Sequence, residues 1–119
     1  EDYVEGMRLM LQQDKPDDYV LATGECYSVK EFVDMVLDKL AIEHTWGTKR
    51  VGDVFIDECY DFDNNVIITT DEKYKRPAEV DLLIGDSTKA REQLGWKPKH
   101  DINSLIDDML KWDLKRAGL

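Results

Sequence analysis

The chain has 119 residues, 42% of them hydrophobic and 35% charged, and its formal net charge at pH 7 is −10. This length suits one domain with a real core, and it is too short for two. The negative charge disfavours binding to nucleic acid or to an anionic membrane surface, and no apolar run approaches the roughly 20 residues of a membrane-spanning helix. We therefore expect a soluble, cytoplasmic protein that binds neither nucleic acid nor membranes.

The first predicted element is a helix over residues 2–13, which DKPDD at residues 14–18 ends with a proline and charges. Because the sequence starts at Glu1 inside this apparent helix, we expect a fragment or a processed chain. A short strand is predicted over residues 18–24, DYVLATG, with Gly24 at its end. The apolar face of the helix is formed by Tyr3, Val4, Met7, Met10 and Leu11.

A second helix has the clearest periodicity in the chain. Ser28 and Glu31 have the spacing of a capping box, which marks its start. Two strands are then predicted over residues 54–60 and 66–70, on either side of the acidic loop at residues 61–65. The apolar residues of the helix recur at helical spacing: Val29, Phe32, Val33, Val36, Leu37 and Leu40.

The last third of the chain predicts a short strand over residues 81–85 and two further helices. Asp86 can cap the helix at residues 87–94, and Gly95 stands where a helix C-terminal glycine belongs. Short strands with at least four helices indicate the α/β class, or α+β at the level of a fragment. The final helix has one apolar stripe, formed by Ile102, Leu105, Ile106, Met109 and Leu110.

The sequence offers no clear metal site. We expect the two cysteines, Cys26 and Cys59, to be reduced thiols of a cytosolic protein, and their positions relative to His44 and His100 lack zinc-site spacing. The acidic loop matches part of a calcium loop, but Val66 occupies the position that requires glycine, which favours a solvated hairpin tip. The matching residues are Asp61, Asp63, Asn65 and Glu72.

The stretch YKRPAEVD, residues 74–81, gathers positive charge in an acidic chain that has only five arginines. The guanidinium of Arg76 can hold a phosphate with two hydrogen bonds, and the carboxylate of Glu79 can accept bonds from a vicinal diol such as ribose. Pro77 fixes its own backbone and disfavours a helical conformation at Arg76. The alternative is a surface turn with a local ion pair, which would contribute little.

The segment YKRPAEVDLLIGDSTKAREQLGWKP, residues 74–98, resembles the C-terminal region of GDP-mannose 4,6-dehydratases, which are extended short-chain dehydrogenase/reductase enzymes. Residues 2–33 resemble the same family, whereas residues 47–65 do not align. The resemblance implies a lyase of GDP-fucose biosynthesis that takes a hydride from sugar carbon 4, eliminates water across carbons 5 and 6, and returns the hydride to carbon 6. It implies NADP for a full-length parent and no cofactor for this chain alone. The family's catalytic residues and glycine-rich loop belong to an N-terminal part, so the isolated chain is expected to be inactive.

The resemblance also implies roles for particular residues. Arg76 would contact the diphosphate of GDP-mannose and Glu79 its ribose, with Tyr74 and Lys75 as adjacent candidates. Gly24 and Glu25 stand where strand ends face the ligand cleft; their alternative is a tight turn and an exposed charge. Within one C-terminal substrate-binding region, residues 1–119, residues 1–26 would complete the Rossmann domain of the parent and residues 27–119 would form a small substrate domain.

Two alternatives for the function stay open. One is the substrate domain of another nucleotide-sugar epimerase or dehydratase, and the other is a non-catalytic nucleotide-sugar-binding module. In a chain that stands alone, without the Rossmann sheet that the resemblance implies, the predicted strand at about residues 19–23 would lack its neighbours. Because an unpaired strand edge invites pairing with another chain, we expect the protein to form a homo-oligomer or to require a missing N-terminal Rossmann portion.

Overall fold

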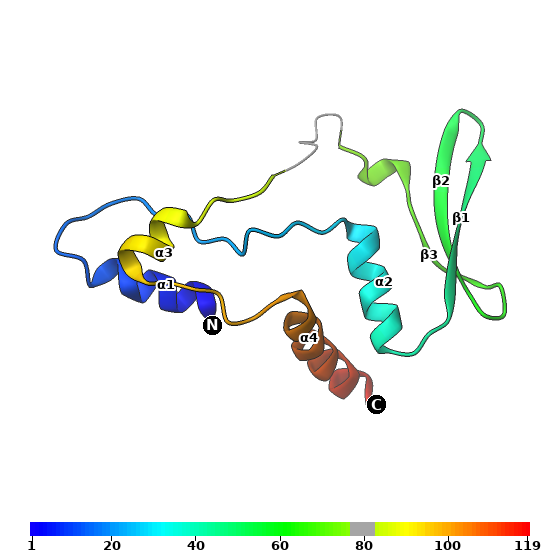
Figure 1. Ribbon diagram of the computed structural model, residues 1–119. Coiled ribbons are helices and arrows are strands. Elements are labelled where there is room, and N and C mark those ends of the chain that lie inside the picture. The colour runs from blue at the N-terminus through cyan, green and yellow to red at the C-terminus, as the bar shows by residue number, and fades with distance from the viewer. Residues whose placement is uncertain (77–82) are drawn as a thin grey trace. The chain divides into compact units, whose positions relative to one another are not determined.

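The computed structural model describes residues 1–76 and 83–119 (Figure 1). The described part contains four α-helices, one 3-10 helix and one three-stranded sheet, which confirms the α+β class. No helix in it is long and apolar enough to cross a membrane. The elements are α1 (Asp2–Leu11), α2 (Val29–Lys39), β1 (His44–Val51), β2 (Val54–Asp61), β3 (Val66–Thr69), the 3-10 helix η1 (Glu72–Tyr74), α3 (Thr88–Leu94) and α4 (Ile102–Ala117).

The chain forms two compact units. The first unit combines the two ends of the sequence, Glu1–Ser28 and Leu82–Leu119, and the second is the intervening Val29–Asp81. The first unit therefore carries α1, α3 and α4, and the second carries α2, the sheet and η1. The assignment of residues 1–26 to the Rossmann domain of a longer parent remains a prediction.

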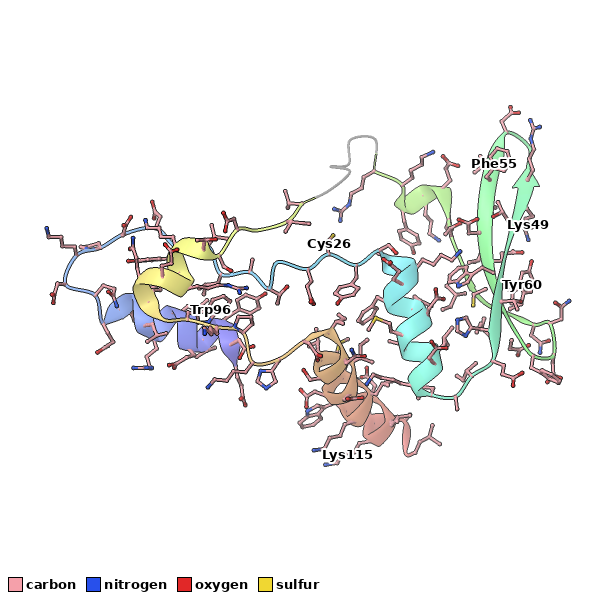
Figure 2. All side chains as sticks on the ribbon, in the orientation of Figure 1. Cys26, Lys49, Phe55, Tyr60, Trp96 and Lys115 are labelled. Atoms are coloured by element: carbon pink, nitrogen blue, oxygen red, sulfur yellow. The ribbon has the colours of Figure 1, made fainter. Side chains whose placement is uncertain are left out.

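The core of the first unit lies where α1 and α3 meet. Trp96, which is 2% exposed, packs there with buried Ala90 and Leu94. Figure 2 shows Trp96 beside these two helices. Its indole Nε1 donates a hydrogen bond of 2.8 Å to the backbone carbonyl of Asp2, which ties the residue after α3 to the start of α1. Partly buried side chains complete the core: Leu9, Met10, Tyr19 and Leu21.

The predicted capping residues lie at the ends of α3 and α4. The N-cap of α3 is Ser87, whose side chain makes no capping bond, and the carboxylate of Asp86 instead accepts a hydrogen bond of 2.9 Å from the backbone N–H of Thr88, the first helical residue. Gly95 ends α3 in the left-handed conformation, with φ of 65°. Asp101 caps α4 by accepting a bond of 2.8 Å from Ser104 N–H. The helix then continues past the predicted apolar stripe to Ala117.

The strand predicted over residues 18–24 is not formed, and this prediction was wrong. Residues 18–24 belong to no strand, and neither do residues 83–85, while residues 81 and 82 of the second predicted strand lie outside the described residues. The two segments do lie side by side, because a Cβ placed on Gly85 would come within 2.6 Å of the Ala22 Cβ. A strand requires a hydrogen-bonded neighbour, and neither segment has one in the described part of the chain.

The second unit is built on an antiparallel sheet in the order β1–β2–β3. β2 and β3 confirm the two predicted strands, whereas β1 was not predicted. Cys59 on β2 is completely buried and pairs with Trp46 on β1 and Ile68 on β3. On the hairpin, Glu58 is 6% exposed and is held by ion-paired Lys49 and by the hydroxyl of Tyr60 at 2.6 Å. Lys49 and Tyr60 are labelled in Figure 2.

Candidate functional site

The predicted anion-binding stretch follows β3 through the short helix η1. The side chain of Asp71 accepts a hydrogen bond of 3.0 Å from the backbone N–H of Lys73 and so caps this helix. Lys75 leaves the helix in an extended conformation, with φ of −68° and ψ of 127°. Local capping therefore ends the helix at Tyr74 and brings the chain to Arg76 on an extended backbone.

The cations of this segment differ in what they contact. Lys73 Nζ lies 2.8 Å from an oxygen of Asp71 and 4.7 Å from the centre of the Tyr74 ring, and Lys75 Nζ lies 3.5 Å from Glu72. Arg76 is exposed and makes no hydrogen bond or ion pair with any other residue in the described part of the chain. Among Lys73, Lys75 and Arg76, only the guanidinium of Arg76 has no partner among the described residues. It is therefore available to bind an anion.

Pairing with Lys73 also sets the ionisation of Asp71. The ammonium group and the backbone N–H of Lys73 lower the pKa of this carboxyl, and Asp71 in turn raises the pKa of Lys73. Both groups are thus held in their charged forms at neutral pH. Sequence reasoning did not assign this role to Asp71 or Glu72, although a carboxylate two or three residues before each lysine in DEKYK was a usable signal.

Glu79, the predicted ribose contact, lies outside the described residues. Of the other predicted contacts near it, Tyr74 is 75% exposed and Lys75 is paired as described above. The structure therefore brings Tyr74, Lys75 and Arg76 together on one short segment of the second unit. The pairing of Arg76 with Glu79 as a phosphate-and-ribose grip stays a prediction.

Gly24 and Glu25 belong to the first unit. Gly24 has a φ of 84°, a left-handed conformation that favours glycine, and the chain bends there before Glu25. The carboxylate of Glu25 accepts a hydrogen bond of 2.9 Å from the hydroxyl of Tyr27. Glu25 and Tyr27 line a cavity of about 740 Å³, together with Thr23 and with residues between Trp96 and Lys111.

The charged side chains that line this cavity are mostly carboxylates. Asp2 accepts hydrogen bonds from the backbone N–H groups of Lys99 and His100, at 2.8 and 2.9 Å, and its other oxygen lies 3.0 Å from His100 Nδ1. The His100 bonds are the main reason why the pKa of Asp2 falls to about 2. The wall carries the carboxylates of Glu1, Asp2, Glu25, Asp101, Asp107 and Asp108, against the basic side chains of Lys111 and His100.

The cavity beside Glu25 and the segment that carries Arg76 differ in charge, and they therefore suit different ligands. A cavity with this excess of carboxylates repels a phosphate group, whereas the open guanidinium of Arg76 attracts one. Gly24 and Glu25 stay predicted substrate contacts, and the positive φ of Gly24 is also compatible with the turn that was their alternative. The acidic residues near the hairpin have a local use as well, because Asp61 accepts bonds from Asn65 in the turn between β2 and β3.

Comparison with known proteins gives a consistent result. The family model described as GDP-mannose 4,6 dehydratase matches residues 1–109. The chain is 44% identical to a GDP-mannose 4,6 dehydratase of Drosophila melanogaster over 96% of its length, and 43% identical to a human protein of that name, again over 96%. A protein of Sinorhizobium fredii named GDP-mannose 4,6-dehydratase is 40% identical over 95% of the chain. These matches cover only 28%, 30% and 31% of the three relatives, so the chain spans about a third or less of their length.

Proposed function

We infer that this chain, which belongs to the GDP-mannose 4,6-dehydratase family, forms the nucleotide-sugar-binding portion of an enzyme that converts GDP-mannose to GDP-4-keto-6-deoxymannose. The observation that carries the proposal is Arg76. It stands in the motif RPAEVD, on an extended segment, and its guanidinium has no partner among the described residues, while the neighbouring lysines are paired with carboxylates.

In this proposal the chain holds the substrate and does not transform it. The guanidinium of Arg76 would bind the diphosphate with two charge-assisted hydrogen bonds, and the carboxylate of Glu79 would accept bonds from the ribose hydroxyls. We assign no NADP site to the chain, because its sequence contains no glycine-rich phosphate loop. NADP, when bound by the remainder of a parent enzyme, supplies the hydride acceptor, so we propose that the isolated chain does not dehydrate GDP-mannose.

Replacing Arg76 with alanine tests the substrate contact. Loss of a charge-assisted phosphate contact should weaken GDP and GDP-mannose binding by about 1.5–3 kcal/mol, which is roughly a 10- to 150-fold rise in Kd. Titration followed by NMR chemical shifts is the suitable measurement, because it reports millimolar affinities. The matched control is Lys73→Ala, which removes a cation that Asp71 already pairs and should change Kd by less than about threefold.

Two outcomes of the same titration would contradict the proposal. If the unsubstituted chain and Arg76→Ala bound GDP with equal affinity, Arg76 would not contact the diphosphate. Equal affinity for UDP-glucose and GDP-mannose would favour another nucleotide-sugar epimerase or dehydratase. The same measurement on a longer protein that carries the Rossmann portion would repeat both comparisons with the complete cleft.

We also propose that the extended segments of the first unit pair with another polypeptide, either the Rossmann portion of a parent or a second copy. Residues 18–24 and 83–85 form no strand, and side chains on both are half exposed or more, including Val20, Leu83 and Ile84. Light scattering after size exclusion should show a mass that rises with protein concentration. A stable monomer at high concentration would exclude the second copy, and failure of a separately expressed Rossmann portion to bind that monomer would then overturn the proposal.

A further inference from the structure

His44 lies at the junction between α2 and β1, within the second unit, and both of its ring nitrogens face oxygen atoms. Nε2 lies 3.1 Å from Oδ1 of Asp34 on α2, and Nδ1 lies 3.0 Å from the backbone carbonyl oxygen of Ile42. The side chain is 11% exposed. Neither a carbonyl nor an ionised carboxylate can donate a hydrogen, so both contacts need hydrogens from the imidazole.

This geometry favours the protonated ring. A neutral imidazole carries one N–H and can satisfy only one of the two oxygens, whereas the imidazolium carries two and satisfies both. The same contacts raise the pKa of His44 above its ordinary value of 6.5, first through the carbonyl of Ile42 and then through Asp34.

The carboxylate of Asp34 also holds a second residue of β1. Its Oδ1 accepts a hydrogen bond of 2.6 Å from the indole Nε1 of Trp46, and the ammonium of Lys30 on α2 lies 4.9 Å from the centre of the Trp46 ring. His44 and Trp46 are two apart on one strand, so their side chains share a face of the sheet. One carboxylate on the helix therefore fastens the helix to two positions of the strand.

The other charged groups around His44 are acidic. Asp38 on α2 favours its protonation, and Asp61 on β2 is its cross-strand partner. Glu43 precedes it, and these residues line the same surface hollow as His44. Lys30 is the cation of this cluster, and it faces the Trp46 ring. The acidic groups nearest His44 thus act in the same direction as the hydrogen bonds, with Asp34 and Asp38 favouring the charged ring.

We propose that Asp34, His44 and Trp46 form a pH-responsive clip that fastens α2 to the sheet. The clip is complete when His44 is protonated and loses one of its two histidine bonds when the ring becomes neutral. Because the pKa is raised in the folded state, the stabilisation is fully present below the ordinary value of 6.5 and is lost as pH rises through the folded pKa.

An NMR titration of the histidine rings tests the proposal directly. The chain has two histidines, so His100→Gln assigns the spectrum. We expect His44 to titrate above 6.5 and amide exchange in α2 to accelerate severalfold between pH 6 and pH 8.5, after correction for the intrinsic effect of pH. In His44→Gln this additional acceleration should be absent. A His44 pKa at or below 6.5, or the same corrected acceleration in both proteins, would overturn the proposal.

Two further variants distinguish the effect of His44 protonation from the effect of side-chain packing between α2 and the sheet. Asp34→Asn keeps an oxygen for the Trp46 indole but removes the charge, and it should lower the pKa of His44. Trp46→Phe removes the indole donor, and it should loosen α2 equally at all pH values while His44 still titrates above 6.5. An unchanged His44 pKa in Asp34→Asn would contradict the role of this carboxylate even if His44→Gln failed to fold.

Discussion

Replacing Trp96 with alanine should destabilise the first unit by about 3–5 kcal/mol, the usual cost of removing a large buried aromatic side chain. Trp96 is the largest side chain in the core between α1 and α3, and its indole bond holds the start of α1. A loss of this size is comparable with the whole stability of many small domains. Urea unfolding followed by far-UV circular dichroism should therefore show a large drop in the midpoint, or no folded baseline.

Two matched variants make this prediction specific. Trp96→Phe fills most of the same space but leaves the Asp2 carbonyl without its donor, and it should cost about 1–3 kcal/mol. Trp112→Ala removes an indole that is 61% exposed on α4, and it should change stability by no more than about 0.5 kcal/mol. Similar unfolding midpoints for Trp96→Ala and Trp112→Ala would show that the core is not where the structure places it.

Replacing Gly85 with alanine should cost about 1–3 kcal/mol, because the new methyl group would overpack a close contact. The added Cβ would lie 2.6 Å from the Cβ of Ala22 and 3.2 Å from Cγ1 of Val20. The Ala22 Cβ is fixed to the backbone and cannot rotate away, so the two extended segments must separate. The unfolding midpoint in urea measures the loss.

A second substitution at the contact point distinguishes overpacking from other effects of alanine. Combining Gly85→Ala with Ala22→Gly removes the fixed methyl group that the new one meets. The double variant should regain part of the lost stability, although glycine at residue 22 itself costs about 0.5–1 kcal/mol. If the two substitutions simply added their separate losses, these segments would not be in contact.

The helices were predictable because their signals are local. Apolar residues recur at helical spacing from Val29 to Leu40, and Asp86, Gly95 and Asp101 act on backbone groups within five residues of themselves. The strands depended on partners that a local pattern does not identify. DYVLATG has the composition of a strand but finds no neighbour in the described part of the chain. HTWGTKRV, in which a glycine and two adjacent basic residues interrupt the apolar pattern, becomes β1 because β2 pairs with it.

In the candidate site, too, local features were predictable and features that depend on the positions of other residues were not. The chemistry of Arg76 was predictable, since a guanidinium held out of a helix by the following proline suits a phosphate group. The sequence did not predict that the neighbouring lysines would be paired while Arg76 is not. That difference follows from where Asp71 and Glu72 lie in the structure. The acidic cavity beside Glu25 could not be predicted, because its wall includes residues about 70 to 85 positions later in the sequence.

The discontinuous first unit has a consequence for how freely the sequence can vary. Its core forms only when residues near Trp96 meet α1, so folding must close a loop that contains the whole of Val29–Asp81. The entropic cost of loop closure grows only with the logarithm of loop length, by about 0.6 kcal/mol for each doubling. Insertions or deletions in the hairpin should therefore be nearly neutral for the Trp96 core. We therefore expect the length of Val29–Asp81 to be changeable by engineering without loss of the core that Trp96 forms with α1 and α3.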